Sequence, residues 1–137
     1  MSSQGRLFCY GTLQLDEVFQ RVCGAKRLSR PALLENHASY VMQGENYPGL
    51  HYEEGQQVNG CLYHGIDSNM WRKLDRFEGQ EYTRKIVTVT LPVTGRIVRA
   101  QVYMLKPAFR AKLSRRAWSK QQFRRKHLSQ FLQAHCQ

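Results

Sequence analysis

Two consecutive stretches of alternating side chains, Tyr82–Leu91 and Arg96–Leu105, constrain the fold of this chain more than any other feature. Apolar residues recur at every second position in both stretches, and the turn-forming residues 92–95 separate them. A period of two predicts strands with one buried face, and the short connection predicts an antiparallel hairpin. A hairpin cannot bury its apolar face alone, so the rest of the chain has to cover it.

The remaining elements give the order strand, helix, several strands, helix, hairpin, helix. We expect further strands over residues 6–9, 26–35, 38–42 and 57–66, and a turn over residues 44–50. Strands dominate and no regular strand–helix alternation is present. The fold class is therefore α+β, with a mostly antiparallel or mixed sheet that can close into a barrel.

A second local signal is the amphipathic helix between Asp67 and Gly79. Asp67 is placed to cap its start and Gly79 to end it. Glu78 lies four residues after Leu74 and seven after Trp71, which puts it on the apolar side of this helix. A carboxylate on a buried face costs free energy unless it has partners or a function.

Charge is distributed unevenly along the 137 residues, which we expect to form one domain over residues 1–137. Residues 82–137 contain 13 of the 21 Lys and Arg and none of the 10 Asp and Glu. This half ends in a basic helix expected over about residues 114–135. A solvated surface, or a docking face for an acidic partner, is the favoured interpretation, ahead of binding to nucleic acid or an anionic membrane.

Several classes of protein are disfavoured by what the sequence lacks. No apolar stretch approaches the ~20 residues of a membrane-spanning helix, and the first residues do not resemble a secretory signal. The four cysteines are scattered, and the five histidines do not have metal-site spacing. We therefore expect a reduced, cytoplasmic protein with no metal, no nucleotide cofactor and no covalent nucleophile.

Two features remain that could carry chemistry, and each has a purely structural alternative. The loop Tyr10-Gly11-Thr12-Leu13 follows the first strand and could be a plain glycine turn whose large side chains fill the core. Glu78 could instead be a surface carboxylate at a helix end, paired with Arg76 or Arg84. Glu81 is a nearby rival for an acid/base role, beyond the glycine that ends the helix.

Taken together, short motifs in a fixed order resemble the γ-glutamyl cyclotransferase-like (AIG2-like) superfamily over roughly residues 6–105. The motifs are Tyr10-Gly11-Thr12-Leu13, Tyr47-Pro48-Gly49-Leu50, Gly60-Cys61-Leu62-Tyr63, Leu74-Asp75-Arg76-Phe77-Glu78-Gly79 and Tyr82-Thr83-Arg84. The resemblance implies a small mixed or antiparallel β-barrel flanked by helices, with one cavity.

The resemblance also implies an activity: release of 5-oxoproline from a γ-glutamyl amine or peptide, without a cofactor. Glu78 would be the acid/base, and the loop Tyr10-Gly11-Thr12-Leu13 would present backbone N–H groups to the small-molecule substrate. Tyr82 would reach the same cavity, and Tyr47-Pro48-Gly49 would form part of its wall. The alternative is a non-catalytic module on the same fold that binds nucleic acid or an acidic partner.

The residues are consistent with this chemistry. The α-amine of a γ-glutamyl group attacks its own side-chain carbonyl, so the nucleophile is already tethered. One carboxylate can take a proton from the α-ammonium group and return it to the departing nitrogen. Burial is expected to raise the pKa of Glu78, which suits a base of this kind. The sequence leaves open which γ-glutamyl conjugate is the substrate.

Overall fold

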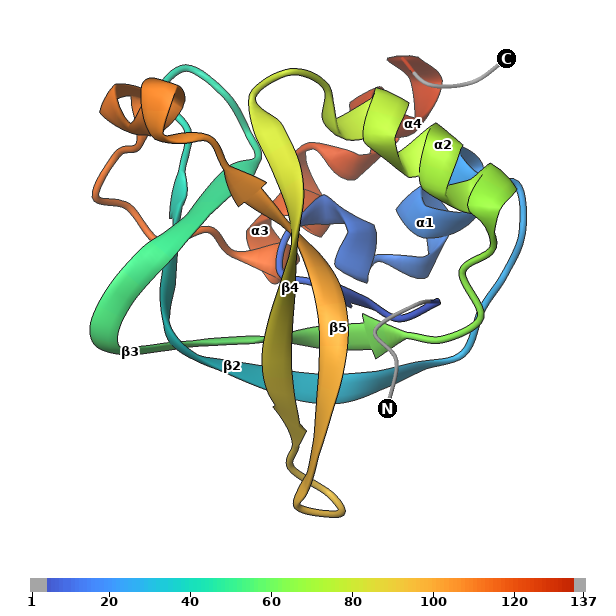
Figure 1. The fold of residues 1–137 in the computed structure, drawn as a ribbon. Helices are drawn as coiled ribbons and strands as arrows, with labels where there is room; N and C mark the ends of the chain where they lie inside the picture. The colour runs from blue at the N-terminus through green and yellow to red at the C-terminus, as the bar shows by residue number, and fades with distance from the viewer. Residues whose placement is uncertain (1–4, 135–137) are drawn as a thin grey trace.

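The computed structural model describes residues 5–134, which form strands, α-helices and two short 3-10 helices around a closed barrel (Figure 1). In chain order these elements are β1 Leu7–Cys9, η1 Thr12–Gln14, α1 Asp16–Cys23, β2 Ser29–Val41, β3 Pro48–Tyr63, α2 Ser68–Glu78, β4 Tyr82–Leu91, β5 Arg96–Leu105, η2 Pro107–Lys112, α3 Lys120–Lys126 and α4 Leu128–Ala134.

The barrel has the strand order β1-β3-β2-β4-β5 and closes through β1 and β5. All neighbouring strands are antiparallel except β1 and β5, which are parallel and meet at Leu7 and Gln101. β4 and β5 pair along their whole length, from Tyr82 opposite Leu105 to Leu91 opposite Arg96. The prediction of an α+β fold with a small mixed barrel and flanking helices is confirmed.

Strand β1 lies between two hydrophobic cores. Phe8 and Tyr10 belong to the core inside the barrel, together with residues such as Leu62 of β3. Leu7 and Cys9 point the other way and join the core that α1 and α2 cover. Successive side chains of a strand alternate between its faces, so three consecutive apolar residues are all buried here.

Helix α2 forms as its sequence predicts. The Asp67 carboxylate accepts a hydrogen bond of 2.9 Å from the Met70 N–H, and Gly79 ends the helix at a φ of +79°. Trp71 and Leu74 are buried, and the helix packs beside α1 on one side of the barrel (Figure 1).

Strands β2 and β3 are longer than the sequence predicts. The strands expected over residues 26–35 and 38–42 are one strand, in which a bulge between Glu35 and His37 accommodates Asn36 at a φ of +60°. β3 begins at Pro48, so Pro48 and Gly49 start a strand, although the sequence predicts a turn there. Long-range pairing between β2 and β3 determines both results.

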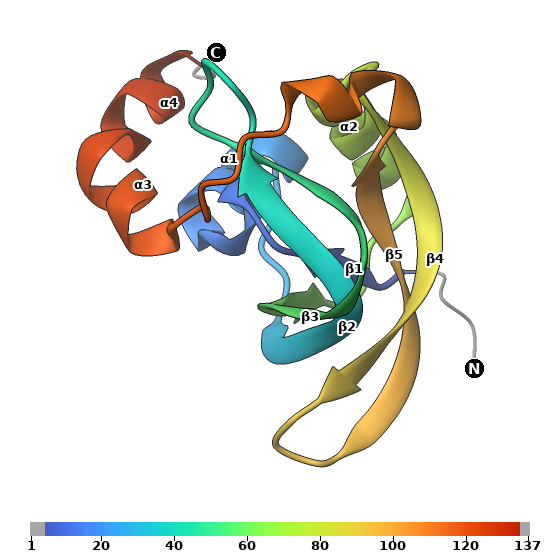
Figure 2. The ribbon, with the colours of Figure 1, turned by 90° about the vertical axis from the view of Figure 1, so that its left-hand side faces the viewer.

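The prediction of a single basic helix over about residues 114–135 is wrong for the part of this segment that the structure describes. The segment contains α3 and α4, which are separated at His127, and the expected last residue 135 lies outside the described part. Leu113, Ser114 and Arg116 instead make backbone contacts with Met42 and Val41, and these contacts keep the chain extended before α3. Figure 2 shows α3 and α4 beside α1, away from the β4–β5 hairpin.

Among residues 5–134, no helix is long and apolar enough to cross a membrane.

Candidate active site

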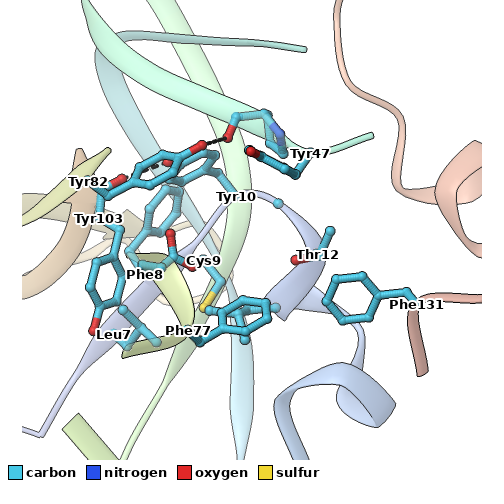
Figure 3. Close-up of a pocket in the computed structure, with 14 residues that line it drawn as sticks. Leu7, Phe8, Cys9, Tyr10, Thr12, Tyr47, Phe77, Tyr82, Tyr103 and Phe131 are labelled. Carbon is cyan, nitrogen blue, oxygen red and sulfur yellow. Dashed lines mark hydrogen bonds between the residues drawn. The ribbon is translucent and has the colours of Figure 1, made fainter. Parts of the chain in front are cut away.

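A cavity of about 270 Å³ lies where β1 enters η1, between this loop and the end of α2 (Figure 3). Strands β1, β4 and β5, the start of β3, and helices α2 and α4 all contribute side chains to it. The lining residues are Leu7, Phe8, Cys9, Tyr10, Gly11, Thr12, Leu13, Tyr47, Pro48, Phe77, Glu78, Tyr82, Tyr103 and Phe131. Glu78 and the loop over residues 10–13 therefore share one cavity.

Position 11 requires glycine because the loop passes very close to the Pro48 ring. A Cβ at this position would lie 2.9 Å from both Cγ and Cδ of Pro48, and real Cβ atoms do not make contacts this short. The φ of Gly11 is −125°, so a positive φ is not the reason for the glycine. The loop and the start of β3 are in direct contact, and they form one wall of the cavity.

Tyrosine hydroxyls fix the geometry of this wall. The Tyr82 hydroxyl donates a hydrogen bond of 2.8 Å to the Pro48 carbonyl, and the Tyr10 hydroxyl donates one of 2.6 Å to the Tyr103 carbonyl (Figure 3). Tyr63, behind the loop, donates to the Leu13 carbonyl at 2.9 Å. Tyr10 and Tyr82 thus line the cavity, with their hydroxyl protons used in the scaffold.

Glu78 is the last residue of α2 and contributes its carboxylate to the cavity lining. Within residues 5–134 we find no hydrogen bond or ion pair to this carboxylate. Burial, with a smaller contribution from the negative charge of Asp75, raises the pKa of Glu78 to about 8. This is the direction that the sequence predicts.

Within residues 5–134, neither Arg76 nor Arg84, the two arginines that could have neutralised Glu78, forms an ion pair with it. Arg84 forms a bidentate ion pair with Asp75, with Nε 2.8 Å and Nη2 3.1 Å from the two carboxylate oxygens. The Arg84 guanidinium also lies 4.5 Å from the ring centroid of Trp71, and the Tyr103 hydroxyl donates to Asp75 at 2.7 Å. Asp75 therefore holds Arg84, and Glu78 keeps its high pKa.

Glu81, the rival carboxylate, has a different environment. Its carboxylate accepts a hydrogen bond of 2.7 Å from Lys112 and a longer one of 3.4 Å from the Tyr47 hydroxyl. It is not among the residues that line the cavity. The geometry favours Glu78 over Glu81 as the group that can exchange a proton with a bound molecule.

Among the described residues, Cys9 is the only cysteine that lines the cavity. Cys9, Cys23 and Cys61 are all free cysteines. Burial raises the pKa of the Cys9 thiol well above its ordinary value, and the neighbouring Cys61 and Glu78 act in the same direction. A protonated thiol is a poor nucleophile.

Among residues 5–134, no group of three or more His, Cys, Asp or Glu side chains could hold a metal ion.

One predicted site residue is not brought into the cavity, and several lining residues could not be foreseen. A Cβ on Gly49 would meet Leu113, Met42 and Leu105, and Gly49 is not among the lining residues, so it lies outside the cavity wall in which the family resemblance places it. Tyr103 and Phe131 line the cavity from β5 and α4, which are remote in sequence from the loop and from α2.

The basic half of the chain is partly neutralised inside the fold. Besides the Arg84 pair, Lys112 lies 2.7 Å from Glu81, and Arg124 of α3 lies 2.6 Å from Glu17 of α1. These ion pairs join the basic C-terminal half to the acidic N-terminal half. Part of the charge asymmetry therefore serves internal contacts.

The closed five-stranded barrel with flanking helices is the fold of γ-glutamyl cyclotransferase-like domains. The sequence pattern of the family described as "Gamma-glutamyl cyclotransferase, AIG2-like" matches residues 7–125, and the chain belongs to this family. A similar relative is Protein AIG2 B of Arabidopsis thaliana, 27% identical over 128 residues. The match covers 93% of this chain and 75% of that protein.

Solved structures share the fold. A solution structure of a protein from Arabidopsis thaliana superposes with a TM-score of 0.73 at 23% identity, covering 95% of this chain and 87% of that one. A structure described as "Gamma-glutamyl cyclotransferase" gives a TM-score of 0.67 at 16% identity, over 74% of this chain and 66% of that one. These identities are low, so the two structures support the fold and carry no argument about substrate.

Proposed function

We propose that this protein is a γ-glutamyl cyclotransferase that releases 5-oxoproline from a γ-glutamyl amine or peptide, with Glu78 as its acid/base. The observation that carries the proposal is an unpaired carboxylate with a pKa of about 8 in the same cavity as the loop over residues 10–13. Family membership supports a cyclotransferase-like enzyme.

In this mechanism Glu78 moves one proton twice. The ionised carboxylate takes a proton from the substrate α-ammonium group, and the free amine attacks the side-chain amide carbon. A new C–N bond closes the five-membered ring, and the bond to the leaving nitrogen then breaks while Glu78 returns the proton to that nitrogen. The ring nitrogen still carries one hydrogen more than the lactam retains, and this second proton passes to the released amine. The products are 5-oxoproline and the amine as its ammonium ion. A carboxyl pKa of about 8 is much closer to that of an α-ammonium group than the ordinary glutamate value is, so the first transfer costs less than it would with an ordinary glutamate.

The substrate's other needs can be met by the wall opposite Glu78. The carbonyl oxygen gains negative charge during the attack and is stabilised by fixed N–H donors. Backbone N–H groups of Gly11, Thr12 and Leu13 are the proposed donors, and Thr12 adds a hydroxyl at the same place. The contact between Gly11 and Pro48 and the hydrogen bond from Tyr82 to Pro48 hold this wall in position.

The direct test measures 5-oxoproline by mass spectrometry after incubation with γ-glutamyl amines, γ-glutamyl amino acids and glutathione. We expect release from at least one compound, and a loss of about 10²-fold or more in kcat for Glu78→Gln. Glu81→Gln is the matched control and should retain turnover within about threefold. Wild-type turnover by Glu78→Gln would show that Glu78 is not the base, and no release from any compound would refute the enzyme.

Binding of an acidic partner or nucleic acid by the basic half is the second candidate. It is favoured by the 13 Lys and Arg without any Asp or Glu in residues 82–137. Contacts to phosphates would make this binding fall steeply with salt. A gel shift with duplex DNA and single-stranded RNA between 50 and 200 mM salt tests binding to nucleic acid, and the absence of a salt-dependent shift would refute that binding.

A further inference from the structure

The cavity contains no positive side chain. Glu78 is the only charged residue among the lining residues in the described part of the chain, and none of them is Lys, Arg or His. Nearby cations are occupied: Arg84 pairs with Asp75, and Lys112 pairs with Glu81. The γ-glutamyl unit already brings one α-carboxylate, together with its own α-ammonium group. A further carboxylate on the leaving group would meet the like charges of Glu78 and of that α-carboxylate and no side-chain counter-ion, which is costly in a desolvated site.

The two ends of the cavity differ in chemistry. In Figure 3, Tyr10, Tyr47 and Tyr82 lie toward one end, and the rings of Phe77 and Phe131 lie toward the other. The Phe77 and Phe131 rings pack edge to face, with their centroids 5.8 Å apart. One end therefore offers hydroxyl groups and the other offers an aromatic surface.

The Phe131 ring is held in place by several contacts of the C-terminal segment. Its centroid lies 5.6 Å from that of the buried Phe123 in a second edge-to-face pair. Arg21 of α1 donates a hydrogen bond of 2.8 Å to the Leu132 carbonyl, and Arg124 pairs with Glu17 of the same helix. These contacts attach α3 and α4 to α1, so Phe131 is a fixed part of the cavity wall.

The γ-glutamyl unit carries the α-ammonium and α-carboxylate groups, and its reacting carbon has to lie near Glu78 and the loop over residues 10–13. The leaving group then occupies the remaining end, beside Phe77 and Phe131. Resting on the cyclotransferase function above, we propose that the cavity selects γ-glutamyl amides of uncharged aromatic or apolar amines, and that Phe131 is the residue that determines this selection.

Three γ-glutamyl compounds separate the two parts of the proposal. γ-Glutamylphenethylamide and γ-glutamylphenylalanine differ by one carboxylate, and γ-glutamylethylamide lacks the ring. We expect kcat/KM for the phenethylamide to exceed that for each of the other two by about tenfold or more, as for other apolar subsites. An equal or higher value for γ-glutamylphenylalanine would overturn the proposal, and the wild-type protein alone gives this answer.

Two variants test the role of Phe131. Phe131→Ala should reduce the preference for the phenethylamide over the ethylamide to less than about threefold. Phe131→Lys should raise kcat/KM for γ-glutamylphenylalanine relative to the phenethylamide by about tenfold, a change that misfolding cannot produce. Unchanged ratios in Phe131→Lys would remove Phe131 from the proposal. Absence of 5-oxoproline with all three compounds and the wider panel would refute the enzyme itself, whereas turnover without the expected preference would refute only the selectivity.

Discussion

Replacing Glu78 by glutamine should stabilise the fold, and the gain should grow with pH. The side chain lies in the cavity without an ion pair, and burial raises its pKa from 4.5 to about 8. Between these values the folded protein binds more protons at this site than the unfolded chain does. The stability of the wild-type protein therefore falls as the pH rises from about 4.5 to about 8, and the full cost is present above that range.

The size of the effect follows from the same shift. One pKa unit corresponds to about 1.4 kcal/mol, so the cost of ionising Glu78 is about 1 kcal/mol at pH 5, about 3 at pH 7 and close to 5 at pH 9. These are upper values because part of the side chain is exposed. Glu78→Gln removes the charge at every pH, and it should gain close to these amounts relative to the wild-type protein.

Urea denaturation at pH 5, 7 and 9 measures the difference directly, with Glu81→Gln as the control. Glu81 accepts a hydrogen bond from Lys112, so its substitution should give no gain. A gain for Glu78→Gln that is the same at all three pH values would refute the reasoning. It would mean that the carboxylate has its ordinary pKa and is solvated in the folded protein.

Three further predictions concern activity. Gly11→Val places a Cβ 2.9 Å from Pro48 and should raise KM by about tenfold or more; an unchanged KM would count against a site built from this loop. If ionised Glu78 is the base, kcat/KM should rise about tenfold between pH 6 and pH 7, and a flat profile would contradict this pKa. Arg84→Met leaves the charge of Asp75 uncompensated, so the midpoint of that profile should move to higher pH; a midpoint that stays in place would separate Asp75 from Glu78.

Local patterns predicted the elements that depend on local interactions. The alternation in Tyr82–Leu91 and Arg96–Leu105 determines the hairpin, and Asp67 and Gly79 set the ends of α2. β2 could not be predicted as one strand, because Asn36 adopts a positive φ in a bulge, and the residues on both sides of the bulge pair with β3, which is remote in sequence. The prediction of a single C-terminal helix was wrong for a similar reason, because the first residues of that segment form backbone hydrogen bonds with the end of β2.

In the candidate site, too, some features could be predicted from local sequence and others depend on long-range packing. The position of Glu78 on the apolar side of α2 follows from its spacing to Trp71 and Leu74. The commitment of Arg84 to Asp75, which leaves Glu78 unpaired, depends on how β4 packs against α2. Phe131 enters the cavity only because α4 folds back over α1, and no local pattern reports a contact of that range.

Strand β1 is three residues long, and it both closes the barrel beside β5 and leads directly into the loop over residues 10–13. A fluctuation that separates β1 from β5 should also displace the N–H groups of Gly11 and Thr12, because these residues follow β1 directly. Closure of the barrel and the position of the proposed N–H donors would therefore change together. Hydrogen exchange at these amides should slow or quicken together with that of the strand itself.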